Sequence, residues 1–137
     1  MTTATAKYLR WRTGLVAYAS VSVRVEPESP ELEVIVSIDG AEFAGAGFED
    51  WRLGAAEGAR YGLDVLGVTA RVEIIEIHGT AVDTNPAALA AAAALAVWKS
   101  LSHEPSQAEI DMLDENVRVY FGVQPSPVPR FQLRHGR

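Results

Sequence analysis

The chain has 137 residues, of which 48% are hydrophobic, with a formal net charge of −6 and no cysteine. This length fits a single domain with a buried core, and the lack of cysteine excludes disulfides, thiol catalysis and cysteine-bound metals. The only long apolar run consists mostly of alanine, and the N-terminus lacks the pattern of a secretory signal. We therefore expect a cytoplasmic protein that does not contact a membrane.

Charge is distributed unevenly along the chain. All eighteen acidic residues lie between residues 13 and 122, whereas the charged side chains of residues 1–12 and 123–137 are all basic. An acidic body repels a nucleic-acid backbone, so nucleic-acid binding is disfavoured except at the two ends. The structural alternative is that these ends fold back on the body or stay in solvent. The candidate nucleic-acid-binding side chains are Arg10, Arg12, Arg130, Arg134 and Arg137.

The first predicted elements are two strands joined as a hairpin. Residues 14–25 and 31–39 alternate apolar and polar side chains, which is the pattern of a half-buried strand. The segment EPESPE between them turns the chain. The alternation places Val21 and Val34 on a buried face. The opposite face receives Tyr18, Ser20 and Ile35.

A helix is predicted from about Glu49 to Leu66, because acidic residues favour a helix N-terminus. Gly54, Gly58 and Gly62 recur within it at a spacing of four. Each glycine in a helix interior costs about 0.5–1 kcal/mol, and a row of small residues allows close backbone approach. We therefore expect this helix face to pack closely on the sheet or on another helix.

A third strand is predicted over residues 68–78, followed by the clearest helix start in the chain. Asn85 is suited to cap an alanine-rich helix that has Pro86 at its first position and ends before Pro105, because both residue types are favoured there. On the strand, alternation directs Val72 inward. The outer face receives Arg71, Glu73, Ile75 and Ile77.

The last predicted elements are a helix and an arm. Ser106 and Glu109 form a predicted capping box for a third helix that ends at Gly122. Residues 123–137 include three prolines in alternation, which favours an extended or disordered conformation. The predicted organisation is one α/β domain over residues 1–122 and a basic, proline-containing arm over residues 123–137.

Residues 55–101 carry a resemblance to a known family. They present in succession a helix, a glycine, a strand, a His and an Asp five residues apart, and an alanine-rich helix. The matching residues are Gly58, Gly67, Val72, Ile74, His78, Val82, Asp83 and Ala90 to Ala94. This order resembles domain IV of the translocating elongation factors, such as elongation factor G.

The resemblance implies a fold and leaves the function open. It implies an α+β, two-layer α/β sandwich with a small, mainly antiparallel sheet, helices on one face and a left-handed β-α-β crossover. In the elongation factors this domain belongs to a GTPase and contacts the ribosomal decoding site, whereas this sequence has no P-loop motif. The same core occurs in kinases and other enzymes, so the fold alone assigns no activity.

One group of residues suits acid–base chemistry. His78 ends the third predicted strand, with Glu76 two residues before it on the same face and Asp83 five residues after it. Such a trio could serve in catalysis or hold a metal. The structural alternative is that Asp83 and Thr84 close the loop and cap the helix at Pro86, and that His78 bonds that loop. No nucleophile elbow, dinucleotide motif or zinc helix is present, and we expect neither a metal nor a cofactor.

The outer face of the predicted sheet is a better candidate for the functional site than this acid–base group. Mixed apolar and charged side chains there suit contact with a second copy or with another protein. The alternative is that the third helix or the C-terminal arm covers this face within one chain. The first hypothesis is therefore a non-catalytic domain that acts by self-association or protein contact. The other two are RNA or ribosome binding through the basic termini, and a small enzyme that uses His78 and Asp83.

Overall fold

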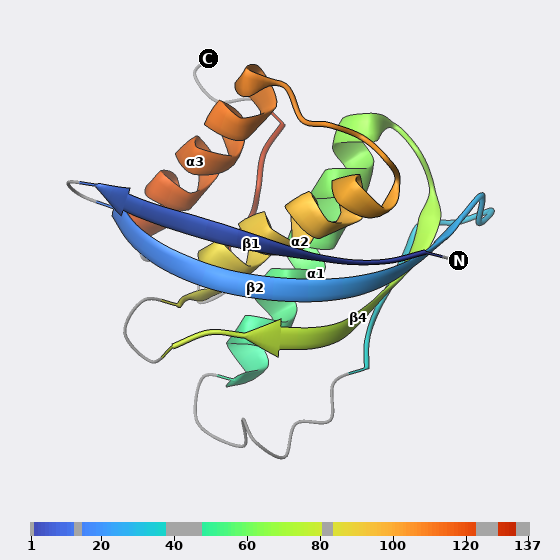
Figure 1. The fold of residues 1–137 in the computed structure, drawn as a ribbon, viewed down its shortest axis with the longest axis horizontal. Coiled ribbons are helices and arrows are strands. Elements are labelled where there is room, and N and C mark those ends of the chain that lie inside the picture. The colour runs from blue at the N-terminus through green and yellow to red at the C-terminus, as the bar shows by residue number, and fades with distance from the viewer. Residues whose placement is uncertain (1, 13–14, 38–47, 81–83, 123–128, 134–137) are drawn as a thin grey trace.

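The computed structural model describes residues 2–12, 15–37, 48–80, 84–122 and 129–133. Within these ranges the chain forms four strands and three helices (Figure 1). In chain order they are β1 (Thr2–Arg12), β2 (Leu15–Pro27), β3 (Glu33–Val36), α1 (Phe48–Leu66), β4 (Ala70–His78), α2 (Pro86–Ser100) and α3 (Gln107–Gly122). None of these helices is long and apolar enough to cross a membrane.

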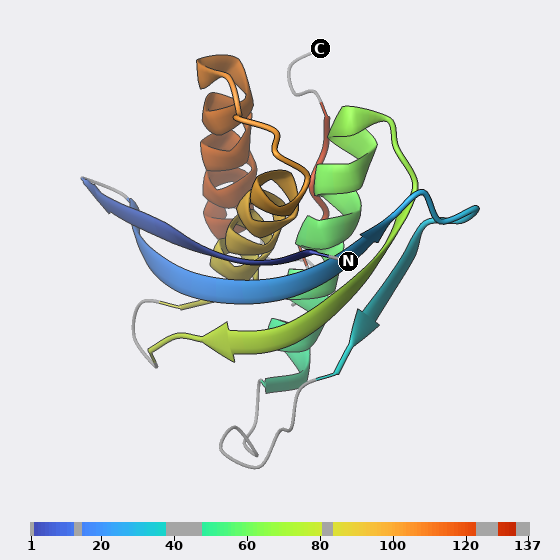
Figure 2. The same ribbon diagram turned by 45° about the vertical axis from the view of Figure 1, so that its right-hand side comes forward.

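The strands form one sheet in the order β1-β2-β4-β3. β1 with β2 and β2 with β4 pair antiparallel, whereas β3 and β4 are parallel and are joined through α1. All three helices lie on the same side of the sheet (Figure 2). The predicted two-layer α+β sandwich with helices on one face is therefore confirmed, while the hand of the β-α-β crossover stays a prediction.

The strands differ from the sequence analysis in two ways. The basic segment at the N-terminus packs on the body as an additional strand that was not predicted, because Thr2 to Arg12 pair along their whole length with β2. The expected hairpin of residues 14–25 and 31–39 was wrong, because β4 lies between β2 and β3. The positions of β2 and β3 are thus set by their pairing with the distant β4 rather than by the turn at EPESPE.

A β-bulge in β4 corrects a third expectation. Val23 lies opposite Ile74, but the next residue of β2, Ser22, lies opposite Glu76, so Ile75 is an extra residue. An extra residue reverses the alternation beyond it. Ile77, expected on the outer face, is therefore 1% exposed within the core, opposite Val21.

The alanine-rich helix α2 lies at the centre of the molecule, with all but two of its residues buried. It packs on β1 and β2 and, on another side, against α1. A Cβ atom added at Gly58 would lie 1.9 Å from the carbonyl oxygen of Ala90, and one at Gly54 would lie 2.4 Å from that of Pro86. The glycine row of α1 thus serves close packing, as predicted, and its neighbour is α2.

Both predicted helix starts have the expected hydrogen bonds. Oδ1 of Asn85 accepts from the Ala88 backbone N–H at 2.9 Å, with Pro86 as the first residue of α2. The backbone N–H of Ser106 donates to Oε1 of Glu109 at 2.8 Å, and that of Glu109 donates to Oγ of Ser106 at 3.1 Å. These local signals fix where α2 and α3 begin.

Candidate functional site

The face of the sheet opposite the helices is the candidate site. Among the parts of the chain that the structure describes, α3 and residues 129–133 both lie on the helical side (Figure 2), so neither of them covers it. We call this surface the open face. Its described side chains come from all four strands, and strand pairing fixes which of them are neighbours.

One end of the open face is apolar. Trp11 and Leu9 of β1 are 83% and 59% exposed, more than any other large apolar side chain in the described ranges. They are two residues apart on one strand, so they share a face, and Leu9 lies opposite the partly exposed Tyr18 of β2. We call Leu9, Trp11 and Tyr18 the hairpin patch.

The middle of the open face is polar and internally hydrogen-bonded. Hydroxyls of Thr5 and Ser22 lie 2.7 Å apart, and Ser22 donates to Oε1 of Glu76 at 3.3 Å. Ser20, predicted on this face, lies opposite both Lys7 and His78 and is buried. The serines of this region are therefore engaged within the sheet, whereas the side chains of Glu76 and His78 beside them are exposed.

The far end of the open face carries paired charges. Nη1 of Arg24 donates to Oε1 of Glu73 at 2.9 Å, and Arg71 lies 3.5 Å from Glu33 across the parallel strands. Hydrogen bonds from Ser37 and then Arg24 lower the pKa of Glu73 below its ordinary value. Both signs of charge alternate here, so this end is complementary to a surface of the same kind.

Two of the predicted apolar contact residues are less exposed than expected. Ile35 lies opposite Glu73 and is half-buried, as is the bulge residue Ile75. With Ile77 in the core, the apolar part of the open face is the hairpin patch rather than these isoleucines. Sequence reasoning found Tyr18 but missed Leu9 and Trp11, because it did not recognise β1 as a strand.

The acid–base group is only partly described. Nε2 of His78 lies 3.2 Å from Oε2 of Glu76, and both side chains are more than half exposed. Asp83 lies outside the described residues, and within those residues no three metal-binding side chains come together. The loop before α2 is tied by Thr84, whose hydroxyl donates to the Tyr18 carbonyl at 2.6 Å and accepts from the Thr80 N–H at 2.7 Å.

Most of the basic candidates are engaged or undescribed. Nε of Arg10 donates to Oδ1 of Asp114 on α3 at 2.8 Å, and the hydroxyl of Tyr8 donates to the same oxygen at 2.7 Å. The Arg10 guanidinium also lies 4.5 Å from the centre of the Tyr8 ring, so it ties β1 to α3. Arg130 is exposed. The side chain of Arg12, and the residues Arg134 and Arg137, lie outside the described parts.

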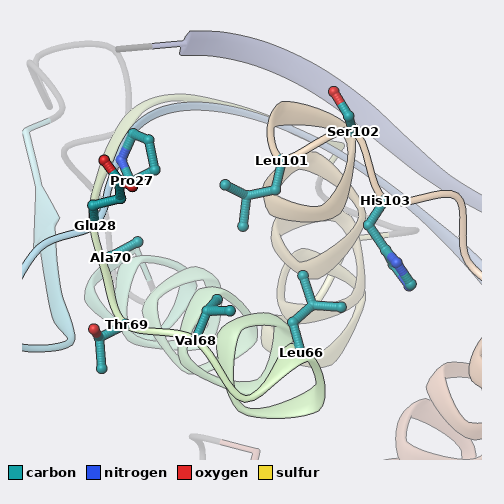
Figure 3. A pocket seen from close by; sticks show the side chains of 9 residues that line it. All are labelled: Pro27, Glu28, Leu66, Val68, Thr69, Ala70, Leu101, Ser102 and His103. Carbon is teal, nitrogen blue, oxygen red and sulfur yellow. The ribbon is translucent and has the colours of Figure 1, made fainter.

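A pocket that the sequence did not indicate lies where β2, α1, β4 and α2 come together (Figure 3). Its volume is about 650 Å³, and Figure 3 shows Leu101 and Val68 pointing into it and His103 pointing away. Glu28 and Ser102 line it with φ angles of 64° and 59°, a conformation that L-residues rarely adopt.

His103, at the edge of this pocket, is held by contacts with α2 and α3. Its Nε2 lies 2.9 Å from Oε1 of Glu109, and its ring stands edge-on to Trp98. The backbone hydrogen bond from Ser106, and then the contact with His103, lower the pKa of Glu109 below its ordinary value. His103 and Glu109 thus secure the connection between α2 and α3.

Comparison with known proteins gives a likeness of fold. No family model and no curated protein matches the sequence. A Thermus thermophilus protein of solved structure is similar with a TM-score of 0.54 and 25% identity, over 74% of this chain and 16% of that chain. A mevalonate kinase and the Methanococcus jannaschii mevalonate kinase align with TM-scores of 0.47 and 0.48 and identities of 12% and 14%. Each alignment covers 93% of this chain and 48% of the kinase.

This chain therefore spans about one sixth to one half of the length of these proteins. At the level of the fold, the chain resembles domain IV of elongation factor G, as its sequence indicates. The likeness assigns no activity, because one fold can host unrelated functions.

Proposed function

We propose that this chain acts by protein–protein contact through the open face of the sheet, and that a second copy is one partner. The observation that carries the proposal is the position of Trp11 and Leu9, the two most exposed large apolar side chains of the described residues, side by side on a face without helices. Tryptophan and tyrosine are enriched among the residues that dominate binding energy at interfaces.

The charges at the other end of the face support contact between identical copies. A two-fold symmetric contact places the same patch on both subunits. The alternation of Arg24 and Arg71 with Glu33 and Glu73 offers both signs to such a partner. An interface then has apolar anchors at the hairpin patch and a polar rim at β3 and β4, the usual arrangement of protein contacts.

Light scattering over a range of protein concentrations tests the self-association. The wild-type mass should rise above that of one chain, and the double variant Leu9→Ser, Trp11→Ser should remain a monomer at all concentrations. Each removed anchor is expected to cost about 1–2 kcal/mol of binding energy.

Leu53→Ser is the matched control, because Leu53 is an exposed leucine on α1, in the helical layer. It should associate like the wild type. A wild type that stays monomeric contradicts the second copy as partner. If the double variant then also captures the same proteins as the wild type, the open face has no role in contact.

A further inference from the structure

The described part of the C-terminal segment is held by side chains of two helices. The backbone N–H of Phe131 donates to Oε2 of Glu57 at 2.9 Å, and Nη2 of Arg60 donates to the Phe131 carbonyl at 3.3 Å. The Gln132 N–H donates to Oδ1 of Asn116 at 2.8 Å, and Nδ2 of Asn116 donates to the Gln132 carbonyl at 3.0 Å. Two consecutive residues are thus bound through their backbone groups, as in the recognition of an extended peptide.

One aromatic side chain anchors the segment. Phe131 is 4% exposed, and its ring stands edge-on to Tyr61 with 5.4 Å between centroids. The neighbouring side chains of Arg130, Gln132 and Leu133 are exposed. Figure 2 shows this segment, in red, running between α1 and α3. We call the side chains of α1 and α3 that hold the segment, Glu57, Arg60, Tyr61 and Asn116, the groove. The groove selects a backbone conformation and one aromatic residue, with Pro129 also buried, and leaves the next side chains exposed.

The groove side chains are positioned by their own helices. Arg60 pairs with Glu57 and Asp64 along α1, and Nδ2 of Asn116 also donates to the Met112 carbonyl of α3 at 3.0 Å. With the segment in place Asn116 is buried, and its amide accepts from the Gln132 N–H and donates to the Gln132 carbonyl. Both groups of the amide are thus matched to one residue of an extended backbone.

We propose that the groove between α1 and α3 is a peptide-binding site, and that the C-terminal segment of a second copy of this chain can replace the chain's own segment there. That segment has the required aromatic residue and backbone, since the structure shows it bound. In one chain the segment competes at an effective concentration in the millimolar range, so its own Phe131 normally fills the site. The site is independent of the open face, because it lies on the helical side of the sheet (Figure 2).

Phe131→Ala in the full-length chain removes the resident anchor and leaves the groove intact. A fluorescein-labelled peptide of residues 129–137, PRFQLRHGR, should bind this variant at least ten times more tightly than it binds the wild type. The same peptide with alanine in place of its phenylalanine should not bind. Adding Asn116→Ala to Phe131→Ala should weaken binding of the unmodified peptide at least tenfold. Fluorescence anisotropy measures each affinity.

Two full-length variants test the exchange between copies. Phe131→Ala has an intact groove and a defective segment, whereas Asn116→Ala has a defective groove and an intact segment. Both also carry Leu9→Ser and Trp11→Ser, which remove the open-face contact. Mixing them should give a 1:1 complex in native mass spectrometry, whereas each alone stays a monomer. No complex, together with no peptide binding to Phe131→Ala, would overturn the proposal.

A measurement on the wild type covers the case in which Phe131→Ala does not fold. Unlabelled peptide at millimolar concentration should shift the amide signals of Phe131 and Gln132 in ¹⁵N-labelled protein, because it displaces the resident segment. Unchanged signals mean that the segment is a fixed part of the fold and that the groove is not a binding site.

Discussion

The two faces of the sheet differ in side-chain size as much as in polarity. On the helical side, β2 presents a row of alanines and valines with almost no exposed surface; these are Ala17, Ala19, Val21, Val23 and Val25. On the open side, the same strand presents tyrosine, serines and arginine, opposite Leu9 and other exposed residues of β1. Small side chains let α2 lie close to the sheet, so most of the packing energy resides on one face. The other face is left for contact or solvent.

The bulge in β4 provides the sharpest test of this difference, because two isoleucines two positions apart have different environments. Ile77→Thr should destabilise the protein by about 2–4 kcal/mol, since it removes buried apolar atoms and places a hydroxyl in the core. Ile75→Thr, at a half-buried position outside the core, should cost less than about 1 kcal/mol. Urea unfolding of both variants measures the two values, and equal losses would contradict the assignment of faces.

The contact between α1 and α2 should be the next most sensitive region. In Gly58→Ala the new methyl group meets the Ala90 backbone, which cannot rotate away, and overpacking of this kind costs about 1–3 kcal/mol. In Gly62→Ala the nearest atom, Cα of Ala94, is 3.3 Å away. Better helix propensity, up to about 1 kcal/mol, should therefore offset most of that strain. Thermal unfolding should rank wild type and Gly62→Ala together, well above Gly58→Ala.

Alkaline pH should weaken the helical layer through Tyr61. Burial, and then the charge of Glu109, raises the pKa of Tyr61 to about 12 from its ordinary value of 10.0. The folded state therefore favours the neutral phenol. The stabilisation of the folded state by the neutral Tyr61 is complete below pH 10 and is lost as pH rises to 12. It amounts to about 1.4 kcal/mol per unit of difference between the folded and unfolded pKa. The stability of wild type relative to Tyr61→Phe should fall over this range. A constant difference would mean that Tyr61 ionises equally well in both states.

The charged end of the open face should give the smallest effect. Arg71 lies 3.5 Å from Glu33 and 4.0 Å from Glu26, with all three side chains substantially exposed. Exposed pairs contribute about 0–1 kcal/mol and are screened by salt. Arg71→Gln should therefore change the free energy of unfolding by less than about 0.5 kcal/mol. A larger loss in urea unfolding would show that this end of the face is structurally important.

The parts of the fold that could be predicted depend on local signals. Asn85 with Pro86, and Ser106 with Glu109, satisfy backbone groups within a few residues, so their positions can be read from the chain. The glycine row on α1 predicted close packing because glycine is costly in a helix unless a neighbour requires it. The resemblance to elongation factor G likewise rests on residues 55–101, where α1, β4 and α2 follow one another.

The parts that were missed depend on contacts between distant segments. The inward positions of β1 carry Ala4, Ala6, Tyr8 and Arg10, so the alternation of apolar and polar side chains in this strand is weak. The bulge at Ile75 and the position of β4 beside β2 follow from sheet pairing. Trp11 was missed because β1 was not recognised as the partner of β2, and the groove around Phe131 exists only when α1 and α3 are assembled.

The bulge also makes β4 tolerant of a change in chain length. In β2, the partners of Ile74 and Glu76 are the consecutive residues Val23 and Ser22. If Ile75 were deleted, Ile74 and Glu76 would also be consecutive, and the two strands would pair without a bulge. Every remaining side chain of β4 would keep its present orientation, whereas a deletion elsewhere in the strand would turn half of them around. Homologues one residue shorter are thus expected to lose their residue at this position and to have a straighter strand there.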